Sequence, residues 1–216
     1  MIKLIKKEFG LAMHPIVPMM LLLSAMVLIP NYPYIVIFFY VSMAIFFTCL
    51  SGRENNDVVY SLNLPIAKKN IVKARFAFAV ILEIVQLIIM IPFSFLNQKI
   101  NPTGNQAGMD ANISLFAIAF IVYGLFNLIF FGSYYKNVSK VGIAFVKSSI
   151  LLFILAGGDV VSSYAIPFVR DVLDTPDPKN LPQKVVFLLV GFLLYLSLTA
   201  LIYKMSVVNF EKQDLN

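Results

Sequence analysis

Two carboxylates, Glu83 and Asp159, lie inside long apolar runs, where a charged side chain needs a structural or functional reason. Glu83 is followed by Gln86, and Asp159 is followed by Ser162, three residues later in each case. On a helix this spacing puts both members of each pair on one face. A charge inside a bilayer costs at least about 2.5–3.5 kcal/mol, so such groups usually face protein or water. We therefore predict that Glu83, Gln86, Asp159 and Ser162 line a translocation path.

Other interpretations of the two carboxylates stay open. They can serve as hydrogen-bond partners that hold helices together, and Gly157-Gly158 can break the helix and leave Asp159 near the outer surface. An ion-coupled carrier would use Glu83 and Asp159 directly. A hydrolytic dyad would need the two carboxylates to meet, and neither lies in a motif that supports this.

Known catalytic and metal-binding motifs are absent from the sequence. It contains no G-x-x-x-x-G-K-[ST], H-E-x-x-H or G-x-S-x-G pattern. His14 is the only histidine and Cys49 the only cysteine, so neither a His-based metal site nor a disulfide within the chain is expected. We predict no catalytic residue, no metal and no cofactor in this chain.

The composition indicates a membrane protein. The chain has 216 residues, of which 60% are hydrophobic and 13% charged, and its mean hydropathy is +0.85. Soluble domains carry about 25% charged residues. We therefore expect one all-α integral membrane domain over residues 1–216. The net charge of +6 comes from basic residues at the edges of apolar runs, which indicates orientation in a membrane and excludes a nucleic-acid partner.

Six apolar runs are predicted to be transmembrane helices, although the first is short for a crossing of about 20 residues. Before them, residues 1–13 are predicted to form an amphipathic helix at the membrane interface. Its apolar side chains Ile2, Ile5, Phe9 and Met13 would enter lipid, and Lys3, Lys6 and Lys7 would face headgroups. The six runs are about 15–29, 34–50, 75–96, 113–131, 141–169 and 185–203.

The distribution of positive charge predicts the orientation. Six spans would put both termini on one side, together with thirteen of the seventeen Lys and Arg residues. The remaining four, Lys99, Arg170, Lys179 and Lys184, would lie on the other side. Because Lys- and Arg-rich loops stay in the cytoplasm, we predict a multi-pass protein of the cell membrane, in contact with lipid, with cytoplasmic termini.

A polar stretch between the second and third spans, residues 51–75, is predicted to contain a short cytoplasmic helix from Asp57 to Leu62. Val58, Val59 and Leu62 would share its apolar face, and Pro65 would prevent its continuation. Such a helix suits docking to a cytoplasmic partner. The alternative is a solvated basic loop that only fixes topology.

The same stretch carries a longer pattern. It reads Arg53-Glu54, then Tyr60-Ser61-Leu62-Asn63-Leu64-Pro65-Ile66, then Lys68-Lys69-Asn70-Ile71-Val72-Lys73-Ala74-Arg75. Together with the basic amphipathic start and the six spans, this pattern resembles the ABC-2 type permeases, the membrane subunits of ATP-binding-cassette exporters. The chain is most similar in character to small Gram-positive permeases that export phenol-soluble modulins or antimicrobial peptides.

The resemblance implies how the chain would work. The short helix would be a coupling helix that fits a groove on an ATPase, with Val58, Tyr60 and Leu62 as anchors and Arg53 and Asp57 as rim charges. The implied coupling residues are Arg53, Glu54, Asp57, Val58, Tyr60, Ser61, Leu62 and Pro65.

The resemblance also implies partners and cargo. Two ATPase subunits would bind ATP and Mg and hydrolyse the ATP, so this chain would not be an enzyme by itself. A second permease, identical or homologous, would complete the dimer, and the cargo would be amphipathic peptides or other hydrophobic molecules. The alternative function is an ion-coupled secondary carrier that uses Glu83 and Asp159; a membrane scaffold or intramembrane enzyme is a third class.

Overall fold

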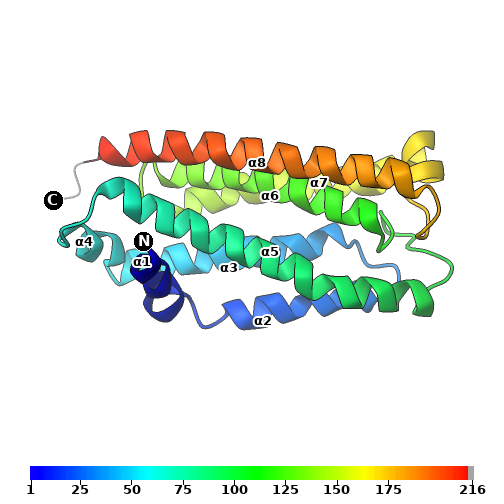
Figure 1. Cartoon of the computed structure of the whole chain (residues 1–216), viewed down its shortest axis with the longest axis horizontal. Coiled ribbons are helices and arrows are strands. Elements are labelled where there is room, and N and C mark those ends of the chain that lie inside the picture. The colour runs from blue at the N-terminus through cyan, green and yellow to red at the C-terminus, as the bar shows by residue number, and fades with distance from the viewer. Residues whose placement is uncertain (214–216) are drawn as a thin grey trace.

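The computed structural model describes residues 1–213, and every regular element among them is a helix. Five long helices run side by side along one axis (Figure 1). All five are long and apolar enough to cross a membrane, as expected for an all-α membrane protein. They are α3 (Ile35–Glu54), α5 (Lys68–Ile100), α6 (Ile113–Tyr134), α7 (Val141–Ala165) and α8 (Leu181–Glu211). The last residues of the predicted polar tail, 214–216, lie outside the described residues.

The first predicted span differs most from expectation. Residues 15–29 do not form one membrane-crossing helix; they contain α2 (Val17–Leu22) followed by a 3-10 helix, Leu23–Leu28. At 1.5 and 2.0 Å per residue these twelve residues reach only about 21 Å, short of the roughly 30 Å of a hydrocarbon core. The preceding helical segment Ile2–Ala12 is bent by 93° against them, and a sixth span exists only if this bent pair counts as one.

The N-terminal segment is helical as predicted, but its faces differ from the prediction. It consists of α1 (Ile2–Lys7) and a π-helix, Glu8–Ala12. Ile2 is exposed, whereas the ring of Phe9 lies 4.9 Å from that of Phe78 on α5. Phe9 therefore packs against protein instead of lipid, because the 93° bend brings this segment across the end of the bundle.

The ends of the other helices also differ from the predicted spans. α5 begins at Lys68 and α8 continues to Glu211, so they are about 50 and 46 Å long and exceed the apolar core. α7 ends at Ala165 and runs unbroken through Gly157-Gly158, so the alternative of a break at these glycines is wrong.

Helix α1, the end of α8 and the short helix α4 (Asp57–Leu62) all lie at one end of the bundle (Figure 1).

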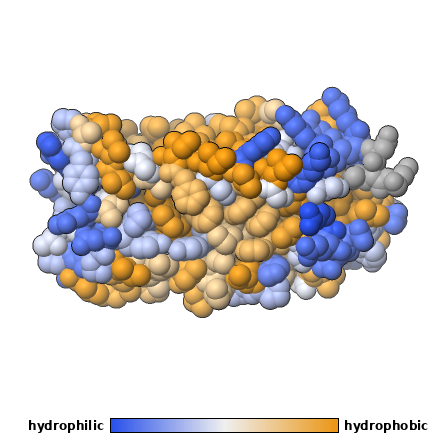
Figure 2. All heavy atoms as spheres, turned by 180° about the vertical axis from the view of Figure 1, so that it is seen from behind, coloured by the Kyte–Doolittle hydropathy of each residue, from blue (hydrophilic) through white to orange (hydrophobic). Residues whose placement is uncertain are grey.

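The surface fits a membrane setting. Hydrophobic side chains form a band over the middle of the molecule, and hydrophilic side chains gather at its two ends (Figure 2). Large side chains on α7 and α8, such as Phe153, Ile154 and Leu193, are each at least half exposed. Lipid tails would cover them, because nothing else in the fold does.

Helices α6 and α8 form the most extensive helix pair of the bundle. Gly191 lets them approach, because a β-carbon there would lie 2.6 Å from the carbonyl oxygen of Ala117. Small residues at such crossings are typical of membrane helix pairs, since packing rather than the hydrophobic effect holds helices together in lipid.

We expect Gly191→Ala to destabilise the purified protein by about 1–3 kcal/mol, the usual cost of overpacking, because the added methyl group meets rigid backbone. Thermal unfolding in detergent, followed by size-exclusion chromatography, measures the effect. Gly157→Ala is the matched control, since a β-carbon at Gly157 meets nothing within 4 Å. Equal unfolding temperatures for the two variants would contradict the close approach of α6 and α8.

Candidate functional site

A buried ion cluster joins three segments at the α4 end of the bundle. Arg75 of α5 contacts Glu8 of the N-terminal segment through Nε, at 2.8 Å, and Asp57 of α4 through Nη2, also at 2.8 Å. Lys7 Nζ lies 2.5 Å from the other Asp57 oxygen and donates to Ser61 Oγ at 2.9 Å. Lys7, Glu8, Asp57 and Arg75 are called the ion cluster below.

The ion cluster fixes the position of α4. Six residues are too few for a helix to be stable alone, and Asp57 in its first turn also complements the helix dipole. The side chains of Glu8 and Arg75 are only 2% and 4% exposed, so loss of either partner would leave a buried charge uncompensated. Lys7, predicted to face lipid headgroups, and Asp57, predicted to choose the partner, bind each other in this structure and hold α4 in place.

The outer face of α4 also differs from the predicted one. Val58 and Leu62 are half-buried and pack against the core, whereas Val59 and Tyr60 are exposed. Leu64, just after the helix, is exposed as well. Of the three predicted anchors, only Tyr60 is therefore exposed to a partner. Val59 and Leu64, which were not predicted anchors, are exposed beside it.

The remaining predicted coupling residues lie around this face. Arg53 and Glu54 are exposed, 3.6 Å apart, and Arg53 also donates to the Ser139 carbonyl. Pro65 is exposed and Ser61 is buried. A hollow of about 220 Å³ between the N-terminal segment and α4 lies beside Tyr60, and its lining is Lys7, Leu11, Ala12, Gly52, Asn55, Asp57 and Tyr60.

A second polar cluster is buried in the middle of the bundle. Glu83 Oε2 on α5 accepts a hydrogen bond from the Tyr195 hydroxyl of α8, at 2.6 Å, and from Asn127 Nδ2 of α6, at 3.3 Å. All three side chains are buried. Glu83 Oε1 and Asn127 Oδ1 have no hydrogen-bond partner among residues 1–213. The carboxyl group thus connects three helices, which favours a helix-linking role.

Gln86 makes a similar connection one turn further along α5. Its Nε2 donates to the carbonyl of Ile37 on α3 at 2.9 Å, and its Oε1 accepts from the Tyr123 hydroxyl of α6. Gln86 is fully buried. The polar face of α5 therefore binds neighbouring helices and lines no open path in this state.

Asp159 makes its contacts away from Glu83, with the loop that follows α5. Its Oδ2 accepts from the backbone N–H of Met109, in the loop after α5, at 3.1 Å, and Ser162 Oγ donates to the Asp159 carbonyl at 3.0 Å. Asp159 shares no hydrogen-bond partner with Glu83 within residues 1–213. The Glu83–Gln86 stripe and the Asp159–Ser162 stripe therefore do not meet in this state. Glu83 and Asp159 form no carboxylate dyad.

The loops at the end opposite α4 hold further carboxylates. Burial raises the pKa of Asp174 to about 7 and also raises the pKa of Asp110, and Asp174 Oδ1 accepts from the Asp110 N–H at 2.7 Å. Lys184 is buried and contacts Asp177 at 2.9 Å. Across residues 1–213 no three His, Cys, Asp or Glu side chains form a group that could hold a metal ion.

Several residues of the ion cluster and of the buried polar cluster were not predicted as site residues from the sequence. Glu8 and Arg75 lie 67 positions apart in the chain, and nothing local pairs them. Tyr123 and Asn127, one turn apart, suggest simple packing, yet they bond Gln86 and Glu83. The available signal was their polar character within an apolar run, because polar groups in lipid need partners.

The comparisons with known proteins concern the chain as a whole. A family model described as "ABC-2 family transporter protein" matches residues 3–211. The searches of curated proteins and of solved structures gave no match. The matched region includes the ion cluster, α4 and the buried polar cluster.

Proposed function

The chain belongs to the ABC-2 transporter family, and from this premise we propose that it is one permease subunit of an ATP-driven exporter. A permease of this family works with an ATPase, and this sequence contains no nucleotide-binding motif. The proposed assembly contains two ATPase subunits, which bind ATP and Mg, and a second permease that is a copy or a homologue of this chain.

The observation that carries the proposal is the arrangement of α4. Tyr60 and Val59 project outward from it while the ion cluster anchors its inner side. An exposed aromatic side chain on a rigid support is the kind of residue that dominates interface energies. The adjoining hollow beside Leu11 and Asn55 would receive a side chain of the ATPase.

The cytoplasmic placement of α4 rests on charge. The end of the bundle that carries α4 also carries most of the Lys and Arg residues, which favours a cytoplasmic location. An ATPase could then reach α4, and the opposite loops would face outward.

The ion cluster supplies the proposed route of coupling. ATP-driven closure of the ATPase pair would push α4, and the Asp57–Arg75 contact would pass the movement to α5. α5 is a continuous helix of 33 residues, so it would act as a lever on the contacts that Glu83 makes with α6 and α8. Such rigid-body transmission needs a two-state element that ATP binding biases.

The proposed cargo is hydrophobic or amphipathic. This choice rests on the resemblance to small Gram-positive permeases that export amphipathic peptides, carried by the pattern in residues 53–75. The alternative of an ion-coupled carrier has less support, because Glu83 and Asp159 bond separate partners.

We expect Tyr60→Asp to weaken binding of the ATPase by at least about 2 kcal/mol, or roughly thirtyfold, because it puts a charge at the centre of the docking face. The measurement is a pull-down of the tagged permease from mild detergent, with ATPase activity assayed on the eluate. Val58→Asp would be a poor choice, since Val58 packs inward and its loss would disturb the fold.

Asn137→Asp is the matched control. It adds one negative charge at the same end of the bundle, on an exposed residue, and its carboxylate can still accept the Ser139 N–H. A co-purifying ATPase that survives Tyr60→Asp would remove α4 from the interface. A wild-type permease that retains no ATPase in several detergents would count against the exporter itself.

A further inference from the structure

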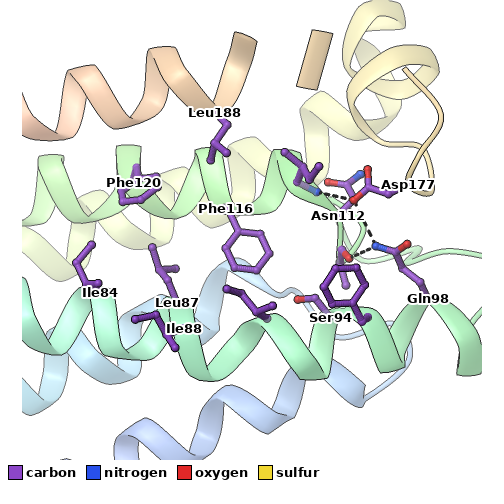
Figure 3. A pocket seen from close by; sticks show the side chains of 14 residues that line it. Ile84, Leu87, Ile88, Ser94, Gln98, Asn112, Phe116, Phe120, Asp177 and Leu188 are labelled. Atoms are coloured by element: carbon purple, nitrogen blue, oxygen red, sulfur yellow. Dashed lines mark hydrogen bonds between the residues drawn. The ribbon is translucent and has the colours of Figure 1, made fainter. Parts of the chain in front are cut away.

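The largely apolar hollow lies in the half of the bundle furthest from α4, between α5 and α6, with α8 beside it (Figure 3). Its volume is about 410 Å³, within the roughly 300–1,000 Å³ of small-molecule sites. It is called the apolar groove below. Its lining is Ile84, Leu87, Ile88, Ile91, Ser94, Phe95, Gln98, Ala111, Asn112, Ile113, Phe116, Phe120, Asp177 and Leu188.

A smaller polar pocket adjoins the apolar groove at the loop end. This pocket has a volume of about 200 Å³, and Gln98 and Ala111 line both hollows. Asn97, Asn101 and Asp110 supply most of its polar lining. Together the two hollows are apolar toward the middle of the bilayer and polar toward its surface. This matches the order of the apolar acyl chain and the polar headgroup in a lipid molecule.

Two unpartnered polar atoms lie along this combined site. Ser94, which is among the residues that line the apolar groove, is 96% buried, and within residues 1–213 its Oγ has no hydrogen-bond partner. Asn101 Nδ2, at the polar pocket, is also buried without a partner. Buried polar atoms are costly to leave unsatisfied, so a bound molecule whose hydrogen-bonding groups reach Ser94 and Asn101 after a small side-chain rotation would stabilise the site.

We propose that this combined site binds one membrane lipid, with an acyl chain in the apolar groove and a neutral, hydroxyl-bearing headgroup in the polar pocket. The site belongs to the permease alone, so the proposal is independent of the transport function.

The dimensions favour a single acyl chain. From Ile84 to Gln98 the groove follows α5 over about 21 Å, slightly more than one leaflet of roughly 15 Å. A helix of about 10 Å diameter and that length would need roughly 1,600 Å³, about four times the volume present. A helix of a second chain or of a peptide cargo could lie across the groove but could not enter it.

The charges favour a headgroup without a phosphate. Of the described residues that line the two hollows, the charged ones are Asp110 and Asp177. Asp177 is already paired with Lys184, which leaves Asp110 to repel an anion. A hydroxyl group suits the pocket, because it can donate to the Asp110 carboxylate and accept from Asn101 Nδ2.

Tryptophan fluorescence offers a direct test, because the chain contains no tryptophan. Phe116→Trp would put a single reporter in the apolar groove, and bromine atoms on an acyl chain quench a tryptophan that they touch. The full chain in detergent is titrated with an acyl-brominated monoacylglycerol, and separately with the brominated fatty acid at neutral pH. Val161→Trp, on the exposed face of α7 at a similar depth, is the control.

The proposal predicts quenching at Phe116→Trp that saturates at low mole fractions of monoacylglycerol, whereas quenching of the Val161→Trp control rises only in proportion to the probe. The fatty acid anion should bind about tenfold more weakly, and Asp110→Asn should remove that difference. Leu188→Trp, on the opposite wall of the groove, repeats the test should Phe116→Trp not fold. Proportional quenching at both groove reporters, or equal binding of the two probes to the unaltered pocket, would overturn the proposal.

Discussion

Arg75→Met is expected to uncouple ATP hydrolysis from transport and to destabilise the permease by about 3–5 kcal/mol, the usual cost of removing one partner of a buried ion pair. Methionine keeps the apolar stem of the side chain but leaves the carboxylates of Glu8 and Asp57 without their guanidinium partner. The purified permease should therefore unfold at a lower temperature. In the assembled transporter, ATPase activity should no longer respond to cargo.

Arg53→Met is the control for this prediction. Arg53 precedes α4, but its side chain is exposed and its ionic partner, Glu54, is exposed as well, so its removal should change stability by less than about 1 kcal/mol. Glu8→Gln provides the second check, because Glu8 and Arg75 should show a coupling energy in a double-mutant cycle. Additive effects of Glu8→Gln and Arg75→Met would show that the two side chains do not act together.

The helices that were predicted best are those whose pattern is purely apolar. The predicted spans 34–50 and 113–131 lie almost wholly within α3 and α6, because an apolar run in lipid has no alternative to a helix. The ends of α5 and α8 were missed because their polar extensions are stabilised by contacts outside the apolar core. One example is the hydrogen bond from Lys68 Nζ to the Gln213 carbonyl.

The first span could not be predicted from hydrophobicity alone. Residues 15–29 are apolar except for Ser24, but Pro15 and Pro18 restrict helix formation at their start. Residues 23–28 form a tighter 3-10 helix in which Asn97 Nδ2 binds the Val27 carbonyl at 2.6 Å. That bond comes from a residue 70 positions away, and local sequence carries no sign of it.

The short helix α4 was predicted at the correct residues, but the side chains that it turns inward were not. Residues 57–62 form a helix, as expected, and Tyr60 is exposed. Because α4 is so short, the apolar residues Val58, Val59 and Leu62 do not determine which side of the helix faces the core. The ion cluster determines it. Asp57 finds Arg75 and Lys7 only in the folded chain, so Val58 and Leu62 turn inward and Val59 outward.

Glu83 provides the second large expected effect, through a comparison of two substitutions. Glu83→Ala should destabilise the protein by about 2–5 kcal/mol, because it opens a cavity and removes the acceptor of the Tyr195 hydroxyl within the membrane. Asn127 Nδ2 would keep only its long contact to Thr199 Oγ1, at 3.4 Å. Glu83→Gln should retain nearly full stability. Its Oε1 can accept the bonds from Tyr195 and Asn127, and its Nε2 can donate to Asn127 Oδ1, which has no partner in the present structure.

This pair of variants also separates the two candidate functions. A glutamine cannot release or take up a proton, so an ion-coupled carrier that uses Glu83 would lose transport completely in Glu83→Gln while staying folded. In the ATP-driven exporter proposed above, Glu83 links α5 to α6 and α8, and Glu83→Gln should keep ATP-dependent transport close to that of the unaltered protein. Thermal unfolding and transport in vesicles with the ATPase partner measure both quantities. A stable but inactive Glu83→Gln would assign the carboxylate to the transported ion, because no loss of helix contacts could then explain the defect.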